Sequence, residues 1–247
     1  NYRFNSNGTP ILPAPKYAVS FVVTPAELTN VVIKINGQAV ENPVDLEAGT
    51  YTVEVSADNC EVFNLNITIT ADTATHTQTI AMTYLPADYT KVDEAIAKAN
   101  ALNKDKYKDF SAVEAAVNAV VRDKNITEQS EVDAMAKAIE DAIAALQYKD
   151  ADYTKVDEAI AKANALKKDD YKDFSGVEAA VKAVVRDKNI TEQSEVDAMA
   201  KAIEDAIAAL QYKDADYTKV DAAIAKANAL KKDDYKDFSG VEAAVKA

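Results

Sequence analysis

The chain contains few of the residues on which most catalytic and metal sites depend. Among 247 residues it has one cysteine, one histidine, five glycines and no tryptophan. A single cysteine, Cys60, allows no internal disulfide, and we expect it to be a small core residue. His76 has no second histidine or cysteine to complete a metal site, so we expect it to face solvent on a strand. Without a Gly-rich loop, a phosphate-binding site is not predicted.

Long apolar runs and an excess of positive charge are also absent. No run of about 18 apolar residues occurs, so no membrane-spanning helix is predicted. The net charge is −13, with acidic and basic side chains interleaved. This pattern argues against binding to nucleic acid and against membrane insertion. The acidic groups around Asp105, Asp109 and Asp169 lack the glycine turn and ligand spacing of a calcium loop. We therefore predict no catalytic residue, no cofactor and no metal site, and we expect the protein not to be an enzyme.

The chain consists largely of sequence repeats instead of such motifs. Residues 87–150 recur almost unchanged as 151–214, and the first half of the unit begins again at 215–247. The third copy differs from the second only where Glu158 becomes Ala222. A catalytic site is needed once, whereas a spacer or a multivalent surface gains from being copied. The four differences between the first two copies are Asn103, Lys106, Ala112 and Asn118, which become Lys167, Asp170, Gly176 and Lys182.

Three apolar stripes with helical spacing occur in each unit. In the first copy they run from Tyr89 to Leu102, from Val113 to Val121 and from Val132 to Leu146. Asp88 or Thr90 would start the first helix. Ser111, followed by Glu114, predicts a capping box for the second helix, and Thr127 would start the third. Short connections force neighbouring helices to run antiparallel, so each unit is predicted to be a three-helix bundle.

Two further features of the repeat bear on function. The joint from Gln147 to Asp152 has no glycine or proline, so we expect it to be short, stiff and able to continue as helix. Aromatic residues recur at one corner of the unit. They are predicted to cap the bundle core, and a repeated binding patch is the alternative. These aromatic residues are Tyr107, Phe110, Tyr171 and Phe174.

Residues 17–86 are predicted to form an antiparallel β-sandwich. Apolar and polar residues alternate with a period of two in this region, as in the stretch from Tyr17 to Val23. Asn36 and Gly37 suit a tight hairpin turn because both tolerate positive φ. The fold class is thus a multidomain α and β chain, an N-terminal β-sandwich followed by tandem three-helix bundles.

Residues 1–16 precede the sandwich and contain three prolines, which predicts an extended, irregular arm. One interpretation is a linker. The other is a strand donated to the open sheet edge of a neighbouring copy, with Tyr2, Phe4 and Ile11 as anchors.

Two segments resemble known families. Asp88-Tyr89-Thr90, the alanine-rich first helix and the stretch ITEQSEVDAMAKAIEDAIAAL make residues 87–247 similar to FIVAR modules, which are repeated bundles of Gram-positive surface proteins. The succession TPAELTNVVIKINGQAVENPVDLEAGTYTVEVSADNC resembles a PEGA-type β-domain. The chain departs from that family at Asn59-Cys60, where a glycine and an aromatic residue are usual. These resemblances imply extracellular stalks, adhesins or binding modules without catalytic residues.

These observations favour a non-enzymatic extracellular protein at a bacterial cell surface or surface appendage. In the first hypothesis it is a structural subunit of a fibre, appendage or layer. Its β-domain and N-terminal arm would self-associate, and its helical repeats would project as a stalk. In the second hypothesis it is a monomeric adhesin whose repeats bind a host glycoprotein, glycan or immunoglobulin.

Overall fold

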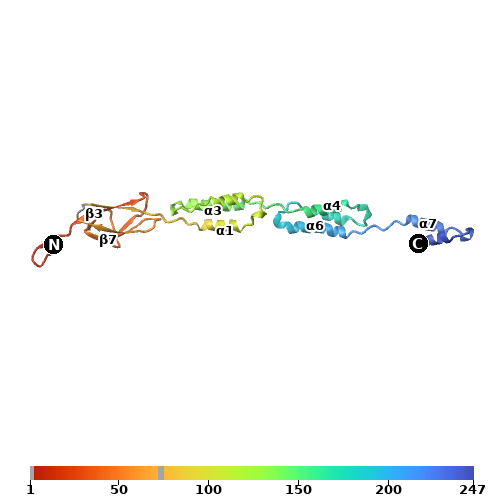
Figure 1. The fold of residues 1–247 in the computed structure, drawn as a ribbon, viewed down its shortest axis with the longest axis horizontal. Coiled ribbons are helices and arrows are strands. Elements are labelled where there is room, and N and C mark those ends of the chain that lie inside the picture. Colours follow the sequence, from red (N-terminus) through yellow and green to blue (C-terminus); the bar gives the residue numbers. More distant parts are fainter. Residues whose placement is uncertain (1–2, 72–74) are drawn as a thin grey trace. The chain divides into compact units, whose positions relative to one another are not determined.

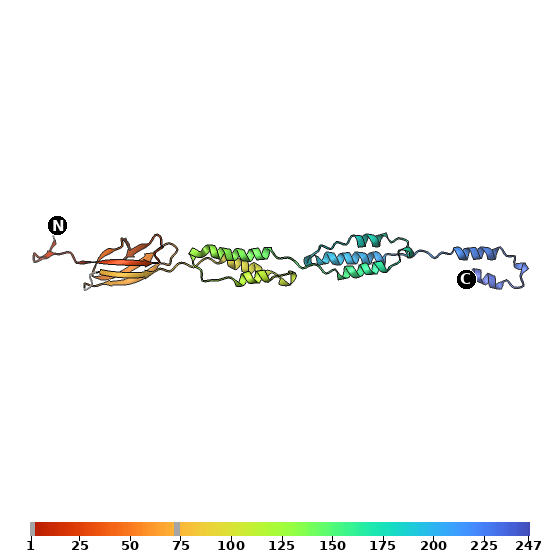
Figure 2. The same ribbon diagram turned by 90° about the horizontal axis from the view of Figure 1, so that it is seen from above.

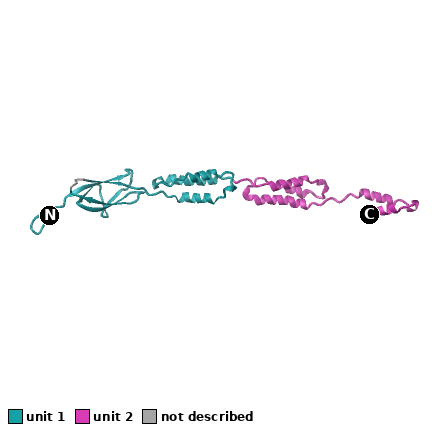
Figure 3. Cartoon of the chain, in the orientation of Figure 1, with its two compact units in different colours: residues 1–147 teal, residues 148–247 magenta. Residues whose placement is uncertain are grey.

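The computed structural model describes residues 3–71 and 75–247, which fall into two compact units, 1–147 and 148–247 (Figure 3). The first unit contains a β region and one helical repeat, and the second contains another repeat and a partial one. The predicted fold class is confirmed, because a β region with two main sheets precedes tandem three-helix units (Figure 1).

The first sheet of the β region contains three strands. β3 (Lys16–Thr24) lies between β6 (Val44–Glu47) and β9 (Thr75–Ala81). β3 and β6 are antiparallel, but β3 and β9 pair in parallel. The sequence predicted antiparallel pairing throughout and differs from the structure at this one pair. The four strands of the other sheet intervene between β3 and β9, so these two are joined by a long crossover and not by a hairpin.

The second sheet has the strand order β5-β4-β7-β8, and all its pairs are antiparallel. Asn36 and Gly37 have φ values of 48° and 82°, so the predicted hairpin turn between β4 and β5 is confirmed. The strands of this sheet are β4 (Val32–Ile35), β5 (Gln38–Val40), β7 (Gly49–Ser56) and β8 (Phe63–Ile69).

Alternate residues of both sheets form one core. Cys60 belongs to it, as expected, and burial raises the pKa of its thiol. Removing this apolar surface from water is the main stabilising contribution to the β region. The most deeply buried residues of this core are Val19, Phe21, Ile33, Ile35, Val53, Val55, Ile67, Ile69 and Ile80.

The chain ahead of β3 folds back on itself. β1 (Arg3–Phe4) pairs antiparallel with β2 (Pro10–Ile11). Gly8, at φ +80°, lies in the turn between them, a conformation that favours glycine. This segment is therefore a small hairpin, where the sequence had predicted an irregular arm.

In the first repeat, α3 (Gln129–Ala144) packs against both α1 (Thr90–Ala101) and α2 (Ser111–Asn118). The buried faces of α1 and α3 are largely alanine and β-branched residues, which permits close packing of the helices. Removing the third helix would expose both of the others. The buried residues are Val92, Ala95 and Ala99 on α1, Val113 on α2, and Val132, Ala136 and Ile139 on α3.

The second helix begins at Ser111, as predicted, but the predicted capping groups of the second and third helices are wrong. Ser111 makes no capping box with Glu114; instead Asp109 accepts a hydrogen bond from the Ser111 amide at 2.8 Å. The third helical segment is capped by Asn125, not Thr127, through a capping box with Glu128. An Asp or Asn two residues ahead reaches the free amides better than the predicted hydroxyls do.

The second unit repeats this arrangement (Figure 2). α6 (Gln193–Ala208) packs against α4 (Thr154–Ala165) and α5 (Ser175–Lys182). The partial repeat supplies α7 (Thr218–Asn228) and α8 (Ser239–Lys246). Short 3₁₀ turns lie between the helices: η1 (Lys104–Lys106), η2 (Ile126–Glu128), η3 (Lys168–Asp170), η4 (Ile190–Glu192) and η5 (Lys232–Asp234).

Candidate interaction surfaces

The segment that leads into the second repeat pairs with the loop ahead of that repeat's third helix. The Ile190 amide donates to the Lys149 carbonyl at 2.8 Å, and the Ala151 amide donates to the Lys188 carbonyl at 3.0 Å. The joint is therefore extended here, and it does not use its capacity to continue as helix. Its backbone groups form hydrogen bonds with residues much later in the repeat. A sequence pattern within one segment does not predict such long-range pairs.

The same pairing joins the β region to the first repeat. The Leu85 amide donates to the Asn59 carbonyl at 2.7 Å, and the Leu85 carbonyl accepts from the Ile126 amide at 2.8 Å. Ala87 then donates to Lys124 at 3.1 Å. Leu85 is thus bonded to both the β region and the first repeat, so the connection between them is not a free linker.

The segment that leaves the second repeat is bonded to the same repeat. The Lys172 amide donates to the Gln211 carbonyl, and the Lys213 amide donates to the Asp170 carbonyl, each at 2.9 Å. Tyr171 stacks on Tyr212, with ring centroids 4.8 Å apart. The second repeat therefore holds both its leading and its trailing segment.

The structure places the predicted aromatic corner at the edge of each bundle. Tyr107 and Tyr171 are each 9% exposed, and each lies 5.9 Å from the half-buried ring of Phe110 or Phe174. Both phenylalanines pack on the helical cores and also line shallow grooves between the first and second helices. These grooves measure about 310 Å³ in the first repeat and 230 Å³ in the second.

The predicted anchors of the N-terminal segment lie on the hairpin of β1 and β2. Phe4 is 59% exposed and Ile11 is 54% exposed, while Tyr2 lies outside the described residues. Leu12, which the sequence analysis did not single out, is 74% exposed. The succession Pro10-Ile11-Leu12 is the sequence feature from which the exposed Leu12 could have been predicted.

His76 does not face solvent, so that prediction is wrong. Its side chain is half-buried on β9, its ring meets Tyr17 edge-on, and its Nε2 is enclosed without a hydrogen-bond partner. The cause is the parallel pairing, which sets His76 beside Val19 of the core strand β3. Within residues 3–71 and 75–247, no group of three or more His, Cys, Asp or Glu side chains could hold a metal ion.

Exposed ion pairs link the helices at equivalent positions of both complete repeats. Lys98 bonds Glu140 at 2.9 Å, and Lys162 bonds Glu204 at 3.0 Å. Arg122 bonds Asp93 and lies 5.3 Å from the centre of the Tyr89 ring. Such exposed pairs each stabilise a protein only slightly.

Lys124 is held between two carboxylates of the first repeat. It bonds both Glu128 and Glu131 at 2.8 Å, and the hydrogen bond to Glu128, followed by that to Glu131, raises the pKa of its ammonium group. In turn, Lys124 and the Asn125 amide lower the pKa of Glu128. These charges fix the loop to which the leading segment is bonded.

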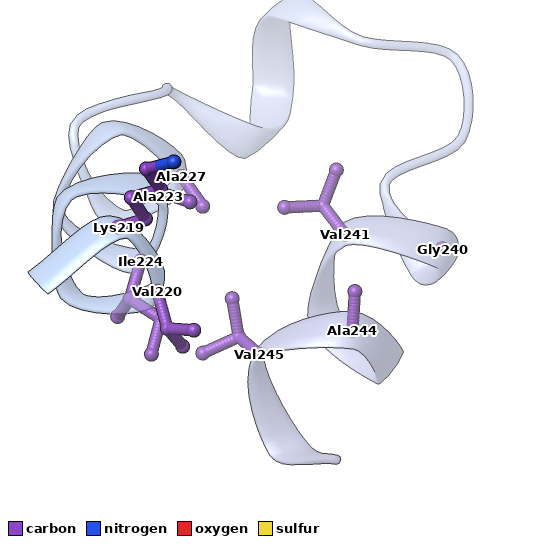
Figure 4. Close-up of a pocket in the computed structure, with 9 residues that line it drawn as sticks. All are labelled: Lys219, Val220, Ala223, Ile224, Ala227, Gly240, Val241, Ala244 and Val245. Carbon is purple, nitrogen blue, oxygen red and sulfur yellow. The ribbon is translucent and has the colours of Figure 1, made fainter. Parts of the chain in front are cut away.

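A groove of about 500 Å³ lies between α7 and α8 of the partial repeat (Figure 4). Val220 and Ile224 on α7 face Val241 and Val245 on α8 across it. Apart from Lys219 its lining is apolar or glycine. The residues along the remainder of the groove are Ala223, Ala227, Gly240 and Ala244.

In the part of the chain that the structure describes, no helix has the length and apolar character needed to cross a membrane. No protein-family model matches the sequence, and no curated protein is significantly similar to it.

Proposed function

We propose that the protein is a non-enzymatic structural protein of a bacterial surface, in which the helical repeats serve as a spacer and the β region with its N-terminal hairpin self-associates. The main support for this proposal is that the backbone hydrogen bond between a repeat and the segment leading into it occurs at both repeats. Leu85 and Lys149 occupy equivalent positions, and each accepts from an isoleucine amide of the following repeat. A joint copied together with its repeat is what a spacer of adjustable length requires.

The chemistry of the repeats supports this proposal. Many of their described carboxylates form surface ion pairs or cap helices, which suits a soluble, inert exterior. The order of segments resembles FIVAR modules after a PEGA-like β-domain, and those families imply extracellular stalks and surface modules. Both lines favour an extracellular location.

An in-register deletion tests the spacer function. Removal of residues 151–214 joins Asp150 to Ala215 and leaves the junction sequence unchanged, because Asp214 precedes Ala215 in the natural chain. We expect the maximum dimension measured by small-angle X-ray scattering to fall by at least about 24 Å, the length of the 16-residue α6. An unchanged dimension, with helical circular dichroism per residue preserved, would contradict the spacer function.

Self-association is proposed through the hairpin segment, because the apolar side chains of Phe4, Ile11 and Leu12 are all largely exposed there. Purified chain should form polymers visible by electron microscopy, and a chain that begins at residue 17 should not. The matched variant is Phe4→Ser with Leu12→Ser, which preserves the chain length. If the natural chain remains monomeric at high concentration, the assembly part of the proposal fails.

A second candidate function is adhesion to a host protein or glycan. It is favoured by the groove beside Phe110, which recurs beside Phe174 one period later. A ligand bound there would be held twice, and its apparent affinity would rise by multivalency. Retention of a serum or mucus component by the natural chain, and its loss in the Phe110→Ser, Phe174→Ser double variant, would support adhesion. No retained component at micromolar protein would oppose it.

A further inference from the structure

We propose that the free edge of β8 is a self-association surface, on which β8 of a second copy of the chain pairs antiparallel across a twofold axis. The contact would join the sheets of two chains into one continuous sheet. It deepens the self-association that the proposed function assigns to the β region and rests on that function, but it uses a strand edge and not the N-terminal hairpin.

The hydrogen bonds of β7 show which way the backbone of β8 is turned. The Asn36 amide donates to the Thr52 carbonyl at 2.8 Å, so the backbone groups of Thr52 point toward β4. Successive residues of a strand direct their amides and carbonyls to opposite sides. The backbone groups of Tyr51 and Val53 therefore point toward β8.

Three residues of β8 direct their backbone groups to the free edge. The partners of Tyr51 and Val53 on β8 are Ile67 and Leu65, whose amides and carbonyls thus belong to the ladder with β7. The alternate residues point the other way, and β8 is the last strand of its sheet among the strands that the structure describes. The residues with outward amides and carbonyls are Asn64, Asn66 and Thr68.

The sequence of β8 is self-complementary about Asn66. In an antiparallel twofold pair centred there, Asn64 lies opposite Thr68 on the outer face, and all three of these side chains are exposed. On the inner face the half-buried Leu65 lies opposite the buried Ile67. Polar residues thus meet polar ones, apolar residues meet apolar ones, and neither strand carries a charge that would repel its copy. This match identifies a second copy of the chain as the occupant.

The other sheet edges lack this match. β5 has three residues and β6 has four, and the exposed Asp45 and Glu47 of β6 oppose pairing with another strand. β9 has seven residues, as β8 has, but a twofold pair about its centre would set the half-buried His76 opposite the buried Ile80. β8 contains no charge, proline or glycine, so it lacks the features by which proteins protect their sheet edges.

The full chain with Phe4→Ser and Leu12→Ser is the background for the test, because these substitutions remove the proposed hairpin contact and leave β8 unchanged. A twofold contact is closed, so this chain should form dimers and no larger species. Sedimentation equilibrium should give a Kd on the order of 100 μM, as expected for a small interface.

Hydrogen exchange locates the contact within β8. The amides of Asn64, Asn66 and Thr68 should become more protected as the protein concentration rises, because they bond the second copy. The Ile67 amide should be protected at every concentration, because it bonds β7. Protection that rises equally at all four amides, or at none, would contradict edge pairing.

Substitutions at Asn66 test the central pair. Asn66→Pro removes an outward amide and leaves the ladder with β7 complete, so the dimer should weaken at least about tenfold. Asn66→Thr keeps the amide and should change the affinity by less than about twofold. Asn66→Lys also keeps the amide but sets like charges opposite each other. Its dimer should weaken about threefold at low salt and recover at high salt.

The outcomes separate this contact from the proposed function. If the hairpin variant is monomeric at about 1 mM, tenfold above the expected Kd, the β8 contact is overturned, and polymers of the natural chain would still uphold the proposed function. If the natural chain stops at a dimer that Asn66→Pro abolishes, the β8 contact stands and the polymer does not. Thr77→Lys, at an exposed position of β9, is the control for the other edge. Loss of the dimer in Thr77→Lys, with the dimer retained in Asn66→Pro, would place the contact on β9 and overturn the proposal.

Discussion

Tyr171 and Tyr212 lie nearly face to face at the end of the second repeat, with 24° between their rings and 3.4 Å between their hydroxyl oxygens. The hydroxyl contact with Tyr212 raises the pKa of Tyr171. The stack lies beside the backbone bonds that hold the trailing segment, so the two tyrosines fasten this segment to its own repeat.

Removal of the Tyr212 ring should loosen the trailing segment. In the Tyr212→Ala chain we expect the Lys172 and Lys213 amides to exchange about two- to tenfold faster, the range expected for loss of one aromatic pair worth about 0.5–1.5 kcal/mol. Tyr212→Phe keeps the ring and should change exchange little. Hydrogen exchange measured by NMR distinguishes the two, and equal rates in all three chains would show that the backbone bonds suffice alone.

Each helical core should respond separately to a cavity. Ile203 is fully buried, and its cluster contains residues of the second repeat only. Ile203→Ala should destabilise this repeat by about 2–5 kcal/mol. Exchange protection of α4–α6 should fall while that of α1–α3 is retained, and Ile139→Ala should give the converse. Equal loss of protection in both repeats after either substitution would contradict separate cores.

Gly176 should tolerate alanine with a gain in stability. It lies in α5, and a Cβ placed there would meet nothing within 4 Å. The first copy has Ala112 at this position. Gly176→Ala should stabilise the second repeat by about 0.5 kcal/mol, because alanine loses less backbone entropy on folding.

The matched control for that substitution is Gly37→Ala. Gly37 also has open space around it but is held at φ +82°, a conformation in which alanine is strained. Gly37→Ala should therefore lower the stability of the β region. Urea unfolding followed by residue-resolved NMR measures both effects, and a stabilising Gly37→Ala would contradict the backbone argument.

Acid should weaken the start of α4. A side-chain hydrogen bond from Thr154, followed by one from its amide, lowers the pKa of Asp152. Because the folded pKa is lower than the unfolded one, the stabilisation is complete above the unfolded value of about 3.9 and is lost as pH falls through the folded pKa. Asp152→Asn keeps a capping oxygen without the carboxyl titration, so exchange of α4 amides should depend less on pH below about 4. If the α4 amides of both chains responded to acid identically, Asp152 would not be the cause of the response.

The apolar periodicity sufficed to predict the helices because each stripe lies within one segment. Val156 and Ile203 could be assigned to a core without knowledge of their partners. The leading segment was different, because Lys149 finds its hydrogen-bond partner 41 residues later at Ile190. Local patterns do not encode such a pairing, and the sequence therefore left a helix open where the chain is extended.

The β region and the candidate surfaces show the same limit. Alternation identified Val19 and Ile80 as inward-facing residues, but alternation is the same in parallel and antiparallel strands. The half-buried environment of His76 results from the parallel pairing. Because that pairing was not predicted, this environment was not predicted either. The aromatic corner was recognised from its recurrence one period later.

The two bonds of Leu85 have a consequence for how the first unit withstands proteolysis. A protease must thread an unpaired, extended stretch of backbone through its cleft. Because Leu85 is bonded to Asn59 on one side and to Ile126 on the other, the junction offers no such stretch while both neighbours stay folded. Cleavage there would first require the β region or the first repeat to open, so the connection is protected by the two structures that it joins.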